Sequence, residues 1–177
     1  MSADGNDADT GFDTPILFAL TLEVDDFHRE WSRCSLLANY VGDYIAYQFT
    51  QRERAENVIS TITNEFLEAV IALAPRPSRL SLRYHQTPGT LAIEAEHDVQ
   101  GGAGRAYCDF LAGLQPAGIR QQYLERLGAG EQTIDPFNQL GLMMLTHDFG
   151  VQFSVQDHEK SGRIKTQLLI PIEALIA

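Results

Sequence analysis

The chain has 177 residues, 44% of them hydrophobic, and a formal net charge of −11 at pH 7. Its length and hydrophobic content suffice for one substantial core, so we expect a single folded domain. The acidic balance with scattered Lys and Arg excludes nucleic-acid binding, and the lack of any apolar run near ~20 residues excludes a membrane-spanning protein.

The first fourteen residues contain four aspartates and no basic residue. Residues 1–14 are therefore predicted to be a disordered acidic tail that precedes the domain over residues 15–177. The start of the chain also lacks the basic and apolar regions of a secretory signal, which predicts a cytoplasmic protein. Cys34 and Cys108 have no CxxC spacing and the five histidines have no ligand spacing, so we expect reduced thiols and no metal site.

The first half of the domain contains clear strand and helix patterns. Pro15–Val24 alternates as a strand, and Trp31–Phe49 and Arg52–Leu73 repeat apolar residues at helical spacing. Proline ends the second helix, because it cannot continue the hydrogen-bond ladder. Arg79–Gln86 and Leu91–His97 then alternate with period two around a turn, which predicts an antiparallel hairpin.

The second half begins with Asp98–Gly104, a segment so rich in glycine that it is predicted to be a mobile loop. Helices, a loop and a second hairpin are expected after it. These are helices over Arg105–Leu114 and Ile119–Leu127, a loop over Gly128–Gln139, a helix from Leu140 through Phe149, and strands over Val151–Gln156 and Arg163–Ile170.

This order of elements predicts the fold class. Helices alternate with antiparallel strand pairs, so the layer rules favour an α+β fold. We expect a two-layer α/β sandwich in which helices cover one face of a mixed, mostly antiparallel sheet. The strand–helix alternation of a parallel, doubly wound fold is absent.

The helix over Trp31–Phe49 is predicted to turn its apolar residues to the core. Its tyrosines allow two interpretations, because a tyrosine buries its ring while its hydroxyl stays hydrated. One interpretation is packing in the core and at its rim, and the other is a protein–protein interface. The apolar residues concerned are Leu36, Leu37, Tyr40, Val41, Tyr44, Ile45 and Phe49, with Tyr47 completing the tyrosine stripe.

Four stretches resemble a known superfamily over about Trp31–Ile172. They are Trp31-Ser32-Arg33-Cys34-Ser35-Leu36-Leu37-Ala38-Asn39-Tyr40, Asn64-Glu65-Phe66-Leu67-Glu68-Ala69, Leu140-Gly141-Leu142 and Asp148-Phe149-Gly150. Together they resemble the GHKL superfamily of histidine kinases, anti-sigma-factor kinases and gyrase-type ATPases. The chain is most similar to small stand-alone bacterial regulators of the SiaB type, including cyanobacterial relatives. The resemblance implies a GHKL-like domain with a nucleotide pocket.

In active members of that superfamily, one helix carries a catalytic carboxylate and, four residues later, an asparagine that binds magnesium. By this resemblance Glu65 stands at the carboxylate position and Ala69 at the asparagine position. A methyl group cannot ligate a cation that requires oxygen. Asn64 and Glu68 lie next to these positions but project about 100° away around the helix, so they would replace the ligand only after rearrangement.

The resemblance also implies which residues would recognise the adenine of a bound nucleotide. Asp98, Gly101 and Gly102 stand where an aspartate followed by glycines reads the adenine amino group in active relatives. Their spacing differs from the usual pattern. An ordinary surface turn explains the same residues, since acidic residues often precede glycines in turns.

The resemblance further assigns residues to the phosphates. Gly141 and Leu142 would begin a helix whose free N–H groups bind phosphate oxygens, although Gln139 replaces a preceding glycine and would crowd that approach. Thr166 would reach a phosphate from the closing hairpin. A threonine is also simply a good strand former.

Two functions follow from these assignments. The first is a cytosolic bacterial signalling regulator with a degenerate GHKL-like domain, which needs no cofactor and acts on a protein partner, such as an anti-sigma-antagonist-like domain in a partner-switching pathway. The second is an active ATP-dependent serine/threonine protein kinase that uses Mg-ATP and Glu65. A homodimer is a further expectation of the first function.

Overall fold

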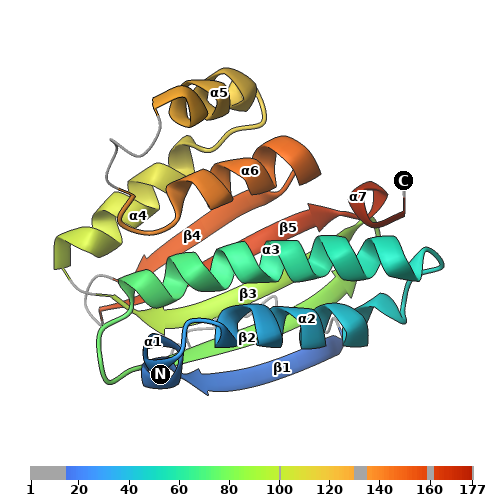
Figure 1. Ribbon diagram of the computed structural model, residues 1–177, viewed down its shortest axis with the longest axis horizontal. Helices are drawn as coiled ribbons and strands as arrows, with labels where there is room; N and C mark the ends of the chain where they lie inside the picture. The colour runs from blue at the N-terminus through green and yellow to red at the C-terminus, as the bar shows by residue number, and fades with distance from the viewer. Residues whose placement is uncertain (1–14, 100, 130–134, 159–161, 177) are drawn as a thin grey trace, which may run out of the picture.

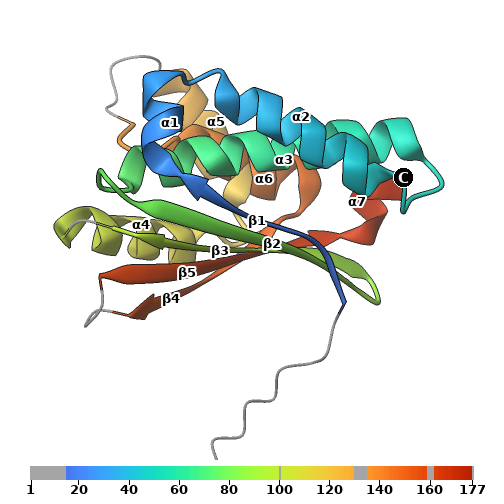
Figure 2. The same cartoon turned by 90° about the horizontal axis from the view of Figure 1, so that it is seen from below.

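The computed structural model describes residues 15–99, 101–129, 135–158 and 162–176. They form one five-stranded sheet with the strand order β1-β2-β3-β5-β4, in which every pairing is antiparallel. Helices pack against one face of this sheet (Figures 1 and 2). The expected α+β sandwich is confirmed, with a sheet that is antiparallel throughout and not mixed.

The elements are as follows: β1 (Ile16–Glu23), α1 (Val24–Arg29), α2 (Arg33–Ala46), α3 (Arg52–Leu73), β2 (Arg79–Thr87), β3 (Thr90–Asp98), α4 (Gly101–Gly113), α5 (Ile119–Ala129), α6 (Gln139–Phe149), β4 (Gln152–His158), β5 (Arg163–Pro171) and α7 (Ile172–Ile176). No helix within these described ranges is long and apolar enough to cross a bilayer. Of the predicted loop over Gly128–Gln139, residues 130–134 lie outside the description.

The sheet forms because its strands alternate apolar and polar side chains. Leu80, Leu82 and Tyr84 of β2 are buried under the helices, while Ser81 and Arg83 between them belong to the opposite face. The β2–β3 hairpin has the predicted position, with Thr87 paired to Thr90 across the turn. The opposite face of the sheet is polar, so the apolar core lies between the sheet and the helices.

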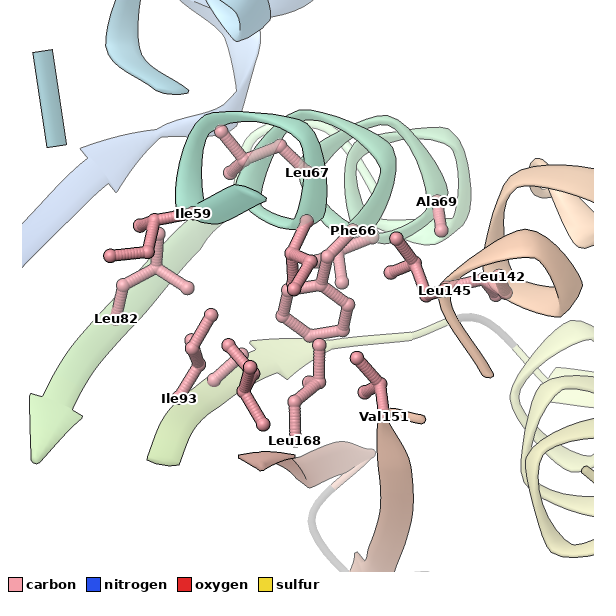
Figure 3. Close-up of a cluster of buried hydrophobic side chains, with 14 of the residues drawn as sticks. Ile59, Phe66, Leu67, Ala69, Leu82, Ile93, Leu142, Leu145, Val151 and Leu168 are labelled. Atoms are coloured by element: carbon pink, nitrogen blue, oxygen red, sulfur yellow. The ribbon is translucent and has the colours of Figure 1, made fainter. Parts of the chain in front are cut away.

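Helix α3 is the central element of the core. It spans Arg52–Leu73 as predicted, and its predicted buried stripe is buried. Figure 3 shows Phe66 pointing from α3 towards the strands, near Ile93 and Leu168. All three side chains are at most 1% exposed, and full burial of each contributes roughly 1.5–3 kcal/mol. This packing fixes α3 in place and with it the side chain of Glu65.

The prediction for α2 was right for Val41, Ile45 and Phe49, which are buried, and wrong for Leu36 and the tyrosines, which are exposed. Gly42 is buried where α2 and α3 meet, and a Cβ at that position would overlap Ser60 Oγ. The close approach rotates the larger side chains outwards. Leu36 and Tyr47 are each 65% exposed, Tyr40 is 59% exposed and Tyr44 is 50% exposed.

The predicted loop over Asp98–Gly104 was also wrong. Helix α4 begins at Gly101, whose backbone has a φ of 46°. The helix is held by Tyr107 and Leu111, which are buried, so tertiary packing outweighs the low helix propensity of the glycines. The short helices α1 and α7 were not predicted either, since each is a single turn or little more.

Candidate functional site

The N-terminus of α6 lies against α3, and Asn138 joins the two. Asn138 has a left-handed backbone with φ 51° and caps α6, its Oδ1 accepting a hydrogen bond from Gly141 N at 3.3 Å. Its Nδ2 donates to the backbone O of Glu65 at 3.0 Å and to the Glu65 carboxylate at 2.8 Å. The structure therefore brings Glu65 and Gly141 together, two residues that the sequence assigned to one site.

A second carboxylate, that of Asp135, closes the same helix end. It accepts hydrogen bonds from Gln139 N at 2.6 Å and Leu140 N at 3.2 Å, and a longer one from Phe137 N at 3.4 Å. The first N–H groups of a helix have no partner within the helix and bear partial positive charge. In this protein a side chain of the chain itself takes the place that an anion would occupy.

The next two N–H groups of α6 are also bonded. Gly141 N donates to Asn138, and Leu142 N donates to the backbone O of Asn138 at 3.1 Å. The first turn of α6 thus has internal acceptors for the N–H groups of all four leading residues, Gln139 to Leu142. Binding a phosphate there would require Asp135 or Asn138 to leave its position.

Gly141 is kept small by its neighbours. A Cβ at this position would overlap the Glu65 carboxylate and would lie 2.5 Å from Asn138 Nδ2. A side chain at this position would therefore displace the ends of the Glu65 and Asn138 side chains and disturb the hydrogen bond between them, a reason for glycine that involves no ligand. The Gln139 side chain points elsewhere and accepts a hydrogen bond from Arg126 of α5 at 3.2 Å.

Asn64 and Glu68, on either side of the Glu65–Ala69 positions, interact with each other. Asn64 Nδ2 donates to Glu68 Oε1 at 3.1 Å, while Asn64 Oδ1 is buried without a protein partner in the described ranges. Asn64 and Glu65 also line a polar hollow between α2 and α3 of about 280 Å³. Its other lining residues are Ser35, Asn39, Glu56, Asn57, Ser60 and Thr61.

Ala69 lies in an apolar environment. It is fully buried, as are Leu142 and Leu145 of α6, and Figure 3 shows it on the side of α3 that faces these leucines. Leu142, one of the predicted phosphate-binding residues, is therefore a core residue that seals α6 onto α3. Within the described ranges, no group of three or more His, Cys, Asp or Glu side chains is placed to hold a metal ion.

The residues assigned to adenine lie at the end of β3 and the start of α4. Asp98 accepts a hydrogen bond from Arg163 Nε at 3.0 Å, an ion pair across the β3–β5 ladder. Gly101 and Gly102 form the first turn of α4, and among the described residues a Cβ at either position would meet no atom within 4 Å. No described atom packs closely enough against residue 102 to require a glycine there.

Thr166, also assigned to a phosphate, is fully buried beneath α4. Its hydroxyl shares a hydrogen bond with Tyr107 OH at 3.2 Å, and the Tyr107 ring packs edge-on against Phe137 and His97. Burial raises the pKa of Tyr107 well above its usual value and lowers that of His97 to about 4, so both groups are neutral at physiological pH. The Thr166 hydroxyl is therefore bonded to Tyr107, whose own ring is packed between other rings.

Asp135 and Asn138 are residues of this site that the sequence analysis did not single out. Asn138 preceding Gly141 is a recognisable helix cap, since Asn is favoured there. The role of Asp135 depends on the turn that leads into α6, which folds the carboxylate back over the helix end.

Among known proteins, only solved structures show similarity to the chain. No protein-family model matches the chain, and no curated protein does. Solved structures with a similar backbone include a chain of the SiaB–SiaC complex from Pseudomonas aeruginosa, with a TM-score of 0.47, 15% sequence identity, and coverage of 88% of this chain and 89% of that chain. The likeness concerns the path of the backbone only.

Proposed function

We propose that this protein is a cytoplasmic signalling regulator with a degenerate GHKL-like domain, which acts by binding another protein and not by transferring phosphate. The partner that fits the proposal is an anti-sigma-antagonist-like domain in a partner-switching pathway. Exposed tyrosines on α2 support a role in protein contact, because large aromatic side chains are enriched at interfaces.

The observation that carries the proposal is the carboxylate of Asp135 on the N-terminus of α6. In a nucleotide site built on a helix N-terminus, the N–H groups bind phosphate oxygens. In this chain those N–H groups already bind a carboxylate, and the Glu65 carboxylate lies beside them. A unit negative charge on an incoming phosphate about 4 Å from either carboxylate would be repelled by about 1 kcal/mol in water. At an effective dielectric constant of about 20, the repulsion would be about 4 kcal/mol.

A metal ion would reduce this repulsion, but the expected ligand is missing. Ala69 offers no oxygen, and its side chain is enclosed by apolar residues of α6. Phosphoryl transfer depends on positioning and on neutralising charge at the phosphates. A chain that places the Asp135 carboxylate on the helix end and lacks the metal ligand is poorly suited to that chemistry.

The alternative function, an active ATP-dependent serine/threonine kinase, is favoured by one observation. Glu65 lies next to Gly141 and the start of α6, which is where a carboxylate that orients an acceptor hydroxyl would be placed. This alternative requires Asp135 to withdraw from the helix end when Mg-ATP binds.

Thermal melting of the full chain with Mg-ATP, and separately with Mg-ADP, distinguishes the two. A ligand at one hundred times its Kd stabilises the folded state by about 2.7 kcal/mol, which corresponds to a Tm increase of about 8 °C for a domain of this size. We expect no increase beyond that given by magnesium salts of equal ionic strength. A saturable increase with either nucleotide would reject the proposal and favour the kinase.

A further inference from the structure

From the polar hollow between α2 and α3, we infer that the protein binds a linear polyamine, a chain of methylene groups with an ammonium group at each end. Figures 1 and 2 show the two helices side by side. The hollow has a volume of about 280 Å³, and its lining consists of hydroxyl, amide and carboxylate side chains. The inference goes beyond the proposed function, which names no small ligand.

Two hydroxyls of the lining are available only as hydrogen-bond acceptors. Ser35 Oγ already donates to the backbone O of Ser32 at 2.9 Å, and Thr61 Oγ1 donates to the backbone O of Asn57 at 2.8 Å. Each hydroxyl has one hydrogen, so only lone pairs are left for a ligand. The side-chain amides of Asn39 and Asn57 have no hydrogen-bond partner within the described ranges, and each offers a further acceptor oxygen. A ligand of the hollow therefore has to supply donors.

Both charged side chains of the lining are negative. Glu65 accepts a hydrogen bond from Asn138 through Oε2, which leaves Oε1 for a ligand, and Glu56 accepts none within the described ranges. The basic residue one turn before Glu56 is Arg52, and it is held by Asp43 at 2.6 Å. The lining contains no Lys, Arg or His. Positively charged donors suit these carboxylates, whereas a phosphate or carboxylate ligand would be repelled.

The dimensions of the hollow favour an elongated molecule over a single ion. Its volume is many times the roughly 30 Å³ that one water occupies. Asn57, Thr61 and Asn64 spread the lining over about 10 Å along α3, and Glu56 and Glu65, nine residues apart, span about 13 Å along the same axis. A metal ion requires several oxygens within about 2–2.6 Å of one point. Two separate carboxylates suit one ammonium group each.

Asn64 adds an acceptor that lacks a partner. Its Nδ2 donates to Glu68 Oε1 at 3.1 Å, and its Oδ1 is buried without a protein partner in the described part of the chain. Buried acceptors are nearly always paired in folded proteins. A small rotation of this amide would turn Oδ1 towards a donor in the hollow. Spermidine, which carries a third N–H group between its two ends, can supply that donor.

Titration of the full chain with spermidine, followed by ¹⁵N NMR of the side-chain amides, tests the inference. We expect saturable movement of the Asn39, Asn57 and Asn64 amide signals. Glu56→Gln removes the charge at one end of the hollow and should raise the Kd about fivefold or more. Asn39→Lys places an ammonium group of the chain itself in the hollow and should abolish binding. Glu53→Gln, an equal change of charge on an exposed residue of α3 outside the hollow, should leave the Kd within about twofold.

The Glu53→Gln control is needed because a chain with a net charge of −11 attracts any polycation. Equal weakening by Glu53→Gln and Glu56→Gln would reduce the binding to this general attraction and overturn the inference. So would the lack of saturable movement of the three amides in the wild type. Melting curves without ligand establish that each variant is folded.

Nα-acetyl-lysine methylamide, which carries a single ammonium group, tests whether both ends of the ligand are needed. We expect it to bind at least about tenfold more weakly than spermidine, because it can pair with only one carboxylate. Equal affinity would overturn the assignment to a polyamine and favour a lysine side chain of another protein. All titrations are made without nucleotide or partner protein, so their failure leaves the proposed function untouched.

Discussion

Replacing Asp135 with alanine removes the carboxylate that closes the N-terminus of α6. The substitution takes away the acceptor for Gln139 N and Leu140 N and removes a negative charge from the positive end of the helix dipole. Loss of a capping side chain costs about 1 kcal/mol, and loss of the charge at an exposed helix end costs about 0.5 kcal/mol more. We expect a total near 1.5 kcal/mol, or a Tm lower by about 4–5 °C.

The same substitution should create an anion site where the wild type has none. The released N–H groups of Gln139 and Leu140 would donate hydrogen bonds to sulfate or inorganic phosphate, which bind at free helix N-termini. Melting curves in sodium sulfate, compared with sodium chloride at equal ionic strength, should therefore show a larger sulfate stabilisation for Asp135→Ala than for the wild type. Asp135→Asn keeps an acceptor without the charge, so its loss of stability should be about 0.5 kcal/mol, a third of that of Asp135→Ala.

Two results would refute this reasoning. If Asp135→Ala were as stable as the wild type, the carboxylate would contribute nothing to closing the helix. If sulfate stabilised both proteins equally, the N–H groups would be available in the wild type, and the main argument against a phosphate site would fail.

Three further changes have expected outcomes in the same melting assay. Gly141→Ala should cost about 1–3 kcal/mol, because its methyl overlaps the Glu65 carboxylate, whereas Gly102→Ala, with open space around it, should be neutral or slightly stabilising; equal effects would contradict the close packing. Ala69→Asn places an amide in the fully buried α3–α6 contact and should cost about 1–3 kcal/mol without any gain in Mg-ATP binding; a stable variant that binds Mg-ATP would show that the nucleotide pocket survives. Burial lowers the pKa of His97 to about 4, so its contribution to stability is complete above the ordinary pKa of 6.5 and is lost as the pH falls towards 4. The loss should reach about 2 kcal/mol near pH 5. His97→Gln should remove this part of the acid sensitivity, and an unchanged pH profile would show that the ring is not buried neutral.

The sequence predicts α3 accurately because two strong signals agree. Its apolar residues keep helical spacing over many turns, and Pro75 and Pro77 follow directly after its end. The β2–β3 hairpin is equally well defined by its alternation and by the turn at Pro88 and Gly89. Where periodicity is long and the breaker residues are clear, local chemistry and tertiary packing favour the same structure.

Helix α2 shows why the rest could not be predicted. Counting tyrosines as core residues makes the predicted core face too wide, because Val41 and Ile45 are buried beside small residues such as Ala38 and Gly42, and the tyrosines are not. The small residues let α2 approach α3 closely, a fact that depends on two helices together and not on one alone. The rings of Tyr40 and Tyr44 pack against Phe18 at the rim of the core and are at least half exposed, so both interpretations made from the sequence stay open.

In the candidate site, too, some features could be predicted from the sequence and others could not. The resemblance pairs Glu65 with Gly141, and the two are neighbours in the structure. Asp135 escapes prediction because its role depends on a turn whose path cannot be read from residue types. Thr166 and Leu142 have types that suit a nucleotide site, but each is enclosed by side chains from distant parts of the chain.

The most direct test of the central claim is the response of the Leu140 and Gly141 backbone amides to Mg-ATP, followed by ¹⁵N NMR on the full chain. Both N–H groups are bonded to side chains of the protein itself. We predict that their resonances stay in place up to millimolar Mg-ATP in the wild type. Saturable movement of both amides with increasing nucleotide would contradict the account, because phosphate would then have displaced Asp135 and Asn138 from the start of α6.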